Sequence, residues 1–412
     1  MRLASKLSLV WLMALCATGP ASARPAAAHM KLERVVMLYR HGVRAPLQGE
    51  AEESLAHEAW PVWSTPESRM TPHGKAGMRL LGVYDRLWLT KEGLLPPSGC
   101  ATTAQVDIWA NKEERTITSA TALAEGLAPG CAVPVGHLAA DAHDPLFEPI
   151  EAQAVPYDPA AALSSFKTAF GSADKLMARH RQAVRTLENI LDCRHTHPAC
   201  DLASVPGDVK IGADGRGIDL TGPIATTSGT AEVFILQYIE GLPLDQVGWG
   251  RASPARLSEI SRLHGLLFDV YVRSPYMAPR IAGPMGRRIL DTLTADNAPP
   301  VTLLVGHDNN IAALAALVGV DFHIDSYGYQ DMPVGGAIGF EVLKSQKTGK
   351  RYVRVIYQAQ TLDQLRTLTP LDLQHPPVVQ TLRMKTCTVN GQALCPLKRF
   401  TSLMNDRMRL ED

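Results

Sequence analysis

The stretch Arg34-Val35-Val36-Met37-Leu38-Tyr39, followed directly by Arg40-His41-Gly42-Val43-Arg44-Ala45, decides the fold. Its continuous apolar run is typical of a strand that is covered on both faces in an α/β sheet. Two arginines and a histidine follow the carboxyl end of this strand, where open α/β sheets bind ligands. Arginine matches phosphate oxygens in geometry and charge, and an unprotonated imidazole is a nucleophile or a base. The alternative is a solvated basic turn.

The first 23 residues have the pattern of a secretory signal peptide. Arg2 and Lys6 supply a positive start, residues 7–17 an apolar stretch, and Ala21-Ser22-Ala23 a small-residue cleavage site. The apolar stretch is too short to span a bilayer. The mature chain is therefore expected to begin near Arg24, as an exported, soluble protein.

The charge balance excludes two classes of partner. The 412 residues include 41 Lys and Arg and 41 Asp and Glu, and loss of Arg2 and Lys6 with the leader brings the net charge to about −2. Nucleic-acid binding and membrane-surface binding both need a basic excess. The sequence therefore predicts neither a nucleic-acid partner nor a membrane partner.

Six of the seven cysteines remain after the leader is removed, an even number that fits an oxidising compartment. Their spacing favours pairing between neighbours in the sequence: Cys100 with Cys131, Cys193 with Cys200, and Cys387 with Cys395. The alternative for the middle pair is a zinc site that also uses His195 and His197, but an oxidising compartment favours the disulfide.

The pattern along the chain predicts an α/β fold interrupted by a helical segment. Strands are predicted at 105–110, 301–305, 337–343 and 352–357, and residues 156–275 carry mostly helical periodicity around a polar, glycine-rich loop at 200–221. We therefore expect a doubly wound, mainly parallel sheet flanked by helices, built from residues 24–155 and 276–412. A mostly helical cap, residues 156–275, is inserted into it.

A second strand, 105–110, leads into Asn111 and a long helix. Asn111 is predicted to cap this helix while Glu114 reaches back to it. Arg115 falls in the first turn, where the helix dipole disfavours a cation, so an anion is expected nearby. The alternative is that Arg115 pairs with Glu113 or Asp107.

A third strand, 301–305, is followed by Gly306-His307-Asp308-Asn309-Asn310. Taken alone, Asp308 or Asn309 would serve as a helix cap. Because a second strand end carries Arg40 and His41, the two turns are expected to converge above one edge of the sheet.

With these elements the sequence resembles the histidine acid phosphatase family, in its bacterial periplasmic branch of phytases and glucose-1-phosphatases. The matching motifs cover almost the whole mature chain: Arg40-His41-Gly42-Val43-Arg44-Ala45-Pro46, Glu114-Arg115-Thr116, Asp144-Pro145-Leu146-Phe147, Gly306-His307-Asp308 and Pro333-Val334-Gly335-Gly336. The resemblance implies a phosphoglycerate mutase-like fold and a periplasmic acid phosphatase. It implies no metal and no cofactor.

The resemblance also implies a role for each matching residue. His41 is the nucleophile that forms a phosphohistidine, and Asp308 protonates the departing alcohol. The phosphoryl oxygens are held by a set of four side chains: Arg40, Arg44, Arg115 and His307.

The expected partners are small-molecule phosphate esters, with phytate favoured over glucose 1-phosphate and other sugar phosphates. Glu232-Val233-Phe234 resembles the phytase pattern, and Glu232 is expected on a helix that overhangs the pocket. Asn309 stands where phytases carry Thr and glucose-1-phosphatases Ser, and the lysine that phytases place after the first motif is missing. The remote alternative is a non-catalytic phosphate-binding protein.

Overall fold

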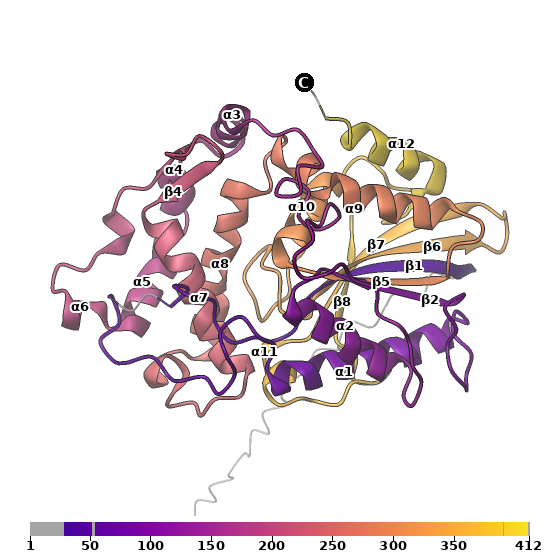
Figure 1. The fold of residues 1–412 in the computed structure, drawn as a ribbon, viewed down its shortest axis with the longest axis horizontal. Coiled ribbons are helices and arrows are strands. Elements are labelled where there is room, and N and C mark those ends of the chain that lie inside the picture. Colours follow the sequence, from indigo (N-terminus) through magenta and orange to yellow (C-terminus); the bar gives the residue numbers. More distant parts are fainter. Residues whose placement is uncertain (1–28, 52–53, 390, 411–412) are drawn as a thin grey trace, which may run out of the picture.

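The computed structural model describes residues 29–51, 54–389 and 391–410, and the predicted signal peptide lies outside them. Its centre is a seven-stranded sheet in the order β2-β5-β1-β6-β7-β8, with β9 paired to β7 (Figure 1). The strands are β1 (Met30–Arg40), β2 (Val106–Ala110), β5 (Val301–Gly306), β6 (Ala337–Ser345), β7 (Arg351–Ala359), β8 (Val378–Leu382) and β9 (Cys395–Pro396).

The α/β class is confirmed, but the sheet is mixed rather than mainly parallel. Only β2, β5 and β1 run parallel to one another, whereas β6, β7 and β8 pair antiparallel with their neighbours. Residues 346–350 connect β6 to β7 as a short turn, which suffices for antiparallel strands, whereas parallel strands need a longer crossover. Strand periodicity located β6 and β7 without specifying their direction, and it missed β8.

Helices cover both faces of the sheet (Figure 1). Helices α1 (Pro72–Lys91) and α2 (Glu114–Leu127) lie on one face, and α9 (Met277–Thr294), α10 (Asp308–Val318) and α12 (Leu397–Arg407) lie on the other. Along β1, Val35 and Met37 belong to the core cluster under the first pair, and Val36 and Leu38 to the opposite cluster. Burial on both faces explains the continuous apolar run.

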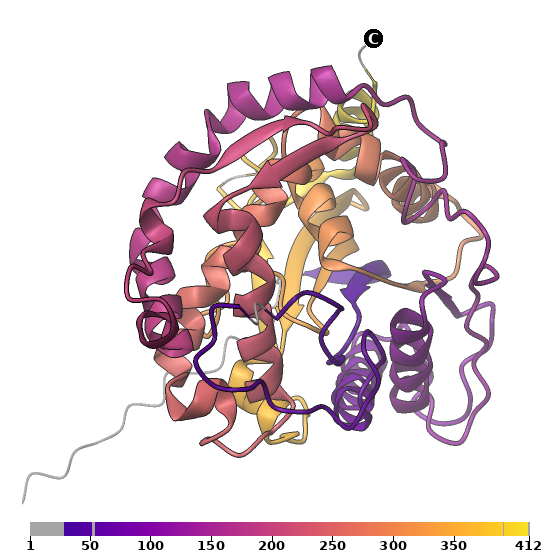
Figure 2. The ribbon, with the colours of Figure 1, turned by 60° about the vertical axis from the view of Figure 1, so that its left-hand side comes forward.

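Residues 159–271 form a separate, mostly helical group beside the sheet (Figure 2). It contains α3 (Pro159–Phe170), α4 (Ala173–Ala178), α5 (Arg181–Leu191), α6 (Cys193–Thr196), α7 (Pro223–Ile239) and α8 (Pro254–Tyr271). The predicted loop at 200–221 instead contains a hairpin of β3 (Asp208–Ile211) and β4 (Ile218–Thr221), turned at Gly215 with φ 68°. The limits 156 and 275 for a cap domain stay a prediction.

The three predicted disulfides are present: Cys100–Cys131, Cys193–Cys200 and Cys387–Cys395. The middle bond occupies the two thiols that a zinc site would need, so that alternative is wrong. Within the part of the chain that the structure describes, no helix has the length and apolar character needed to cross a membrane.

Candidate active site

The three predicted turns meet at one edge of the sheet. Arg40 lies opposite Gly306 in the register of β1 and β5, and the His41 backbone N–H donates to the Gly306 carbonyl at 3.0 Å. The Asn111 N–H donates to the Val305 carbonyl at 2.9 Å at the end of β2. Parallel pairing therefore brings together residues as far as 266 positions apart in the sequence, Arg40 and Gly306.

A fourth segment, Pro333-Val334-Gly335-Gly336, fixes the backbone of the first motif. The Arg40 N–H donates to the Gly336 carbonyl at 2.8 Å, and the Gly335 N–H donates to the His41 carbonyl at 2.9 Å. Gly335 has φ 70°, a conformation that favours glycine. Both backbone groups of the strand end are thus held in place before any ligand arrives.

The prediction that Asn111 caps α2 is wrong. Asn111 instead connects two of the turns. The N-cap residue of α2 is Glu113, and its side chain makes no cap hydrogen bond. The Asn111 amide donates to Asp144 Oδ2 at 3.0 Å, and its Oδ1 accepts from His307 Nε2 at 2.9 Å. A carboxamide oxygen only accepts, so His307 carries its proton on Nε2.

His41 presents an unprotonated nitrogen to the cavity. Its Nδ1 lies 2.8 Å from the Gly42 carbonyl, which only accepts, so Nδ1 is the donor and Nε2 carries the lone pair. Burial and the nearby Arg40 and Arg115 lower the pKa of His41 well below its ordinary value. Burial and Arg115 likewise lower the pKa of His307, to about 3. Both imidazoles are neutral in mildly acidic solution.

Arg40 is buried beneath the cavity rather than along its lining. Its Nη1 donates to the Met332 carbonyl at 2.5 Å, and its Nη2 lies 2.5 Å from Glu232 Oε1 and 2.8 Å from Asp308 Oδ2. Glu232 is only 1% exposed and is absent from the described lining, whereas its helix α7 contributes Thr226 and Ser228 to that lining. Its carboxylate holds the Arg40 guanidinium in position.

Arg44 and Arg115 line the cavity, each with a carboxylate partner. Arg44 makes two bonds to Glu50, at 2.7 and 2.8 Å, and Arg115 Nη1 lies 3.2 Å from Glu113. The predicted alternative pairing of Arg115 is therefore present. Among the described residues, the buried Nε atoms of Arg40 and Arg115 have no hydrogen-bond partner. The arrangement leaves cationic donors available for an anion.

Asp308 lies in the first turn of α10, between Arg40 and His264. Its Oδ1 accepts from the Asn309 N–H at 2.8 Å, and its Oδ2 lies 3.6 Å from His264 Nε2. Burial raises the pKa of Asp308, but Arg40 and His264 outweigh burial and hold that pKa well below its usual range. Asp308 is therefore ionised in the unliganded protein.

His264, on α8, lines the cavity beside Asp308. Its Nδ1 lies 3.1 Å from Asp331 Oδ1 and 3.8 Å from Glu232 Oε2. Burial lowers the pKa of His264, whereas Glu232 and Asp331 raise it, and the net shift is upward. Asp331 was missed by the sequence analysis; its one sequence signal is its place two residues before the Pro333 motif.

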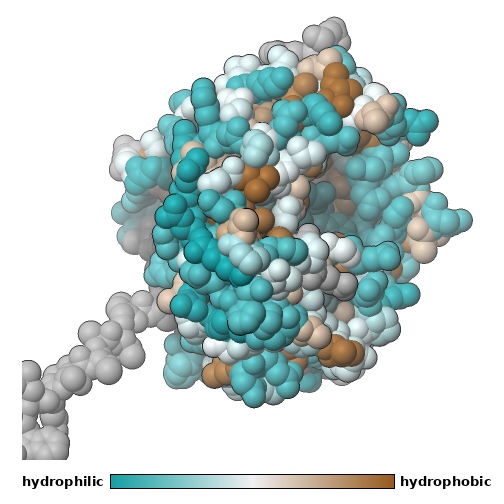
Figure 3. Space-filling view, turned by 90° about the vertical axis from the view of Figure 1, so that its left-hand side faces the viewer, coloured by the Kyte–Doolittle hydropathy of each residue, from teal (hydrophilic) through white to brown (hydrophobic). Residues whose placement is uncertain are grey.

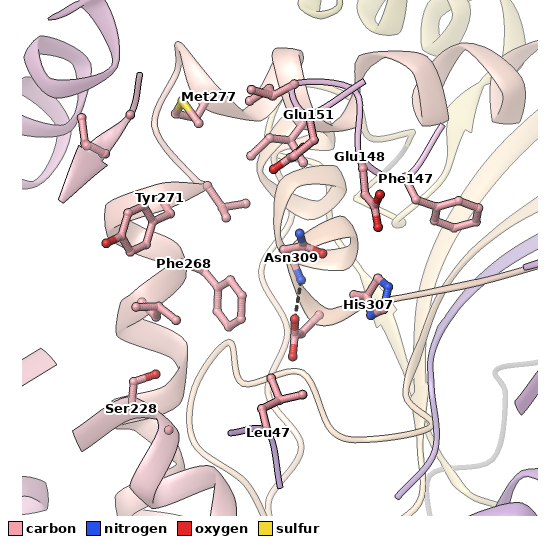
Figure 4. Close-up of a pocket in the computed structure, with 18 of the residues that line it drawn as sticks. Leu47, Phe147, Glu148, Glu151, Ser228, Phe268, Tyr271, Met277, His307 and Asn309 are labelled. Atoms are coloured by element: carbon pink, nitrogen blue, oxygen red, sulfur yellow. Dashed lines mark hydrogen bonds between the residues drawn. The ribbon is translucent and has the colours of Figure 1, made fainter. Parts of the chain in front are cut away.

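The cavity above these residues has a volume of about 1770 Å³. It appears as a hollow in the surface in Figure 3, and Figure 4 shows its interior. Of the predicted residues, the lining includes His41, Arg44, Arg115, His307, Asp308 and Asn309, and Arg40 lies directly behind them. We call Arg40, His41, Arg44, Arg115, His307 and Asp308 the phosphate nest.

Residues 31–358 match the family model of the histidine phosphatase superfamily, branch 2. The chain belongs to this superfamily. It is 32% identical to phytase AppA of Escherichia coli strain K12 and 31% identical to a glucose-1-phosphatase of Salmonella typhimurium. The alignments cover 92% and 91% of this chain, respectively, and 92% of each relative.

A similar fold is found in the solved structure of the Hafnia alvei phytase in complex with tartrate. The TM-score is 0.85 at 30% identity, over 94% of this chain and 100% of the phytase. The expected α/β fold class and the family resemblance are both confirmed. As a member of this family the chain is an enzyme, a histidine-type phosphatase.

Proposed function

We propose that the protein hydrolyses phosphomonoesters through a phosphohistidine formed at Nε2 of His41. The observation that carries this proposal is the orientation of His41. Its Nδ1–H donates to the Gly42 carbonyl, so the free lone pair is on Nε2. The ring lines the cavity beside Arg44 and Arg115. The neutral state of the ring keeps this lone pair available in acid.

In the first step, Nε2 attacks phosphorus and the bond to the ester oxygen breaks. Charge on the phosphoryl oxygens is stabilised by the Arg44 and Arg115 guanidinium groups, which line the cavity, and by the positive charge of Arg40 behind Asp308. Asp308 gives its proton to the departing alcohol. In the second step, Asp308 takes a proton from the water that attacks the phosphohistidine, the bond between Nε2 and phosphorus breaks, and inorganic phosphate leaves, which restores both groups.

Asp308 must gain a proton before it acts as an acid, because it is ionised in the unliganded protein. A bound phosphate anion competes with Asp308 for Arg40 and thereby raises the pKa of the carboxyl. A substrate that enters as a monoanion also carries a proton into the site. Both effects favour activity in acid, where the neutral His41 remains a nucleophile.

Phytate and glucose 1-phosphate are the two candidate substrates. Phytate is suggested by the similarity to the phytases of Escherichia coli and Hafnia alvei, and by a cavity large enough for an inositol ring with its phosphates. Glucose 1-phosphate is suggested by the glucose-1-phosphatase relative and by the cavity lining, which has no lysine among its described residues. The periplasm is the proposed location, because of the expected signal peptide.

The proposal is tested by phosphate release from phytate, glucose 1-phosphate and phenyl phosphate at pH about 4–5. We expect turnover of at least the simple ester, with inorganic phosphate as a competitive inhibitor. A protein that binds inorganic phosphate but hydrolyses none of the three esters would contradict the proposal. It would instead support the non-catalytic alternative.

A further inference from the structure

Beyond the phosphate nest, the cavity has a second part with a different chemistry. We propose that this part binds the alcohol half of the ester, and that its preferred occupant is an uncharged ring carrying hydroxyl groups or an aromatic ring. This inference rests on the proposed function, because it concerns the group that leaves when the phosphoryl group is transferred.

One side of the cavity is apolar. It is formed by side chains from the end of α8 and the start of α9, which we call the apolar wall: Leu267, Phe268, Tyr271, Val272, Met277 and Ile281. Figure 4 shows Phe268, Tyr271 and Met277 on one side of the cavity and His307 on the other. Aromatic faces pack well on the C–H surfaces of sugar rings and on aromatic groups. They offer a highly charged group no polar contacts to compensate for its lost hydration.

The charges around the cavity lead to the same conclusion. Its described lining contains three arginines, Arg44, Arg115 and Arg216, and four carboxylates, Glu50, Glu148, Glu151 and Asp308. Arg44 is paired with Glu50, and Arg115 belongs to the phosphate nest. Arg216 is therefore the one arginine of this lining that remains for further phosphates. Glu148 is paired with Lys112, whereas Glu151 repels further phosphates. An ester with one phosphate and a neutral alcohol avoids this repulsion.

Two buried polar atoms of the cavity lining lack a hydrogen-bond partner among the described residues. Ser228 Oγ, on α7, and Asn309 Oδ1, on α10, make no hydrogen bond within the described residues. Ser228 is only 1% exposed. An unpartnered buried hydroxyl or carboxamide oxygen is unfavourable, and hydroxyl groups on a bound ring would satisfy both. Phosphate oxygens satisfy Asn309 Oδ1 poorly, because both atoms are acceptors.

The test compares kcat/KM for 1-naphthyl phosphate, glucose 1-phosphate and phytate in the wild type and in Tyr271→Ala. Loss of the ring is expected to raise KM for naphthyl phosphate about 10-fold, the effect of a good aromatic contact, with kcat little changed. Tyr271→Phe should restore the wild-type value. Inhibition by inorganic phosphate should stay the same in all variants, because phosphate occupies only the nest. Tyr329→Ala is the matched control, since Tyr329 is 56% exposed and lies outside the lining.

A charge change tests the same inference in the opposite direction. Glu151→Lys is expected to raise kcat/KM for phytate about 3–10-fold, because it replaces a repelling group with an attracting one, and to leave naphthyl phosphate unchanged. Glu67→Lys, a change of equal charge at an exposed residue outside the lining, should do neither.

The inference is overturned if wild-type kcat/KM is higher for phytate than for both ring monophosphates. It is also overturned if Tyr271→Ala lowers kcat/KM for all three esters by the same factor. Either result leaves the proposed function standing, because the esters are still hydrolysed. Failure of the proposed function is a different outcome, in which the wild type hydrolyses none of them.

Discussion

The two parts of the cavity differ in how their polar groups are held. In the phosphate nest the charged groups are paired within the protein: Arg40 contacts Glu232 and Asp308, and Arg44 contacts Glu50. The Nε atoms of Arg40 and Arg115 still lack a partner among the described residues. On the other side, Ser228 Oγ and Asn309 Oδ1 are unpartnered and the apolar wall offers only contact area. The charged groups of the phosphate nest are therefore positioned before substrate binds, whereas the polar atoms and the apolar wall on the other side gain their contacts from the substrate.

This difference separates chemistry from selectivity. A charge that is fixed before binding stabilises the transition state of every ester in the same way. A contact with the alcohol discriminates among esters and has little effect on the phosphoryl step. Substitutions in the nest should therefore affect all substrates in proportion, and substitutions in the wall should affect them unequally.

The largest expected effect is that of His41→Ala. Without the nucleophile, kcat should fall at least about 10³-fold on every ester, whatever its alcohol. Inorganic phosphate should still bind, because the arginines remain, and its dissociation constant measured by calorimetry checks this. Substantial hydrolysis that survives in His41→Ala would remove His41 as the nucleophile.

Asp308→Asn should separate esters by leaving group. Loss of the proton donor is expected to slow alkyl phosphates about 10²-fold or more, whereas p-nitrophenyl phosphate, whose leaving group needs no proton, should change little. The measurement is kcat for both esters in the same variant. Equal losses on the two would show that Asp308 holds Arg40 rather than donating a proton.

Asn111→Ala and Asn309→Ala form a matched pair across the two parts of the cavity. Asn111 positions His307, so its loss should reduce kcat/KM about 10-fold for all esters alike. Asn309 faces the alcohol, so its loss should lower kcat/KM for glucose 1-phosphate and leave naphthyl phosphate unchanged. If both variants give the same substrate profile, the division of the cavity into two parts is wrong.

The smallest effect concerns stability and pH. The pKa of His264 is raised in the folded protein, so protonated His264 stabilises the fold below its unfolded pKa of about 6.5. This contribution is lost as the pH rises through the higher folded pKa. Urea unfolding at pH about 5 and about 8 should therefore show a free-energy difference between wild type and His264→Gln that shrinks at the higher pH.

His180 supplies the control with the opposite sign. Burial and Arg262 lower its pKa, so its contribution is present above its unfolded pKa and is lost in acid. The difference between wild type and His180→Gln should grow as the pH rises. A His264→Gln difference that also grows would contradict the charge assignment of His264.

The phosphate nest could be predicted from the sequence because its residues lie in short motifs at strand ends. Arg40 and His41 follow one buried run and His307 follows another, and parallel strands bring their carboxyl ends to one edge. The expectation of a mainly parallel sheet was wrong, because β6, β7 and β8 pair antiparallel with their neighbours and strand periodicity does not register direction.

The supporting side chains were harder to predict. Asn111 is of a residue type that commonly caps helices, yet its carboxamide forms hydrogen bonds with Asp144 and His307. Only tertiary contacts determine which of these roles it takes. Glu232 was predicted as a specificity residue because its neighbours resemble a motif, but its carboxylate contacts Arg40 behind the cavity. The apolar wall carries no motif, because aromatic and aliphatic residues at helical spacing look the same in a core and in a cavity.

The central claim is that the phosphoryl group passes through Nε2 of His41, and it is tested by rapid denaturing quench during turnover of a labelled ester. The quenched protein is kept alkaline, where phosphohistidine survives, and its peptides are analysed by mass spectrometry. The account predicts a phosphorylated peptide containing His41 in the wild type and none in His41→Ala. Phosphate found on another residue, or an active enzyme that never carries it, would contradict the account.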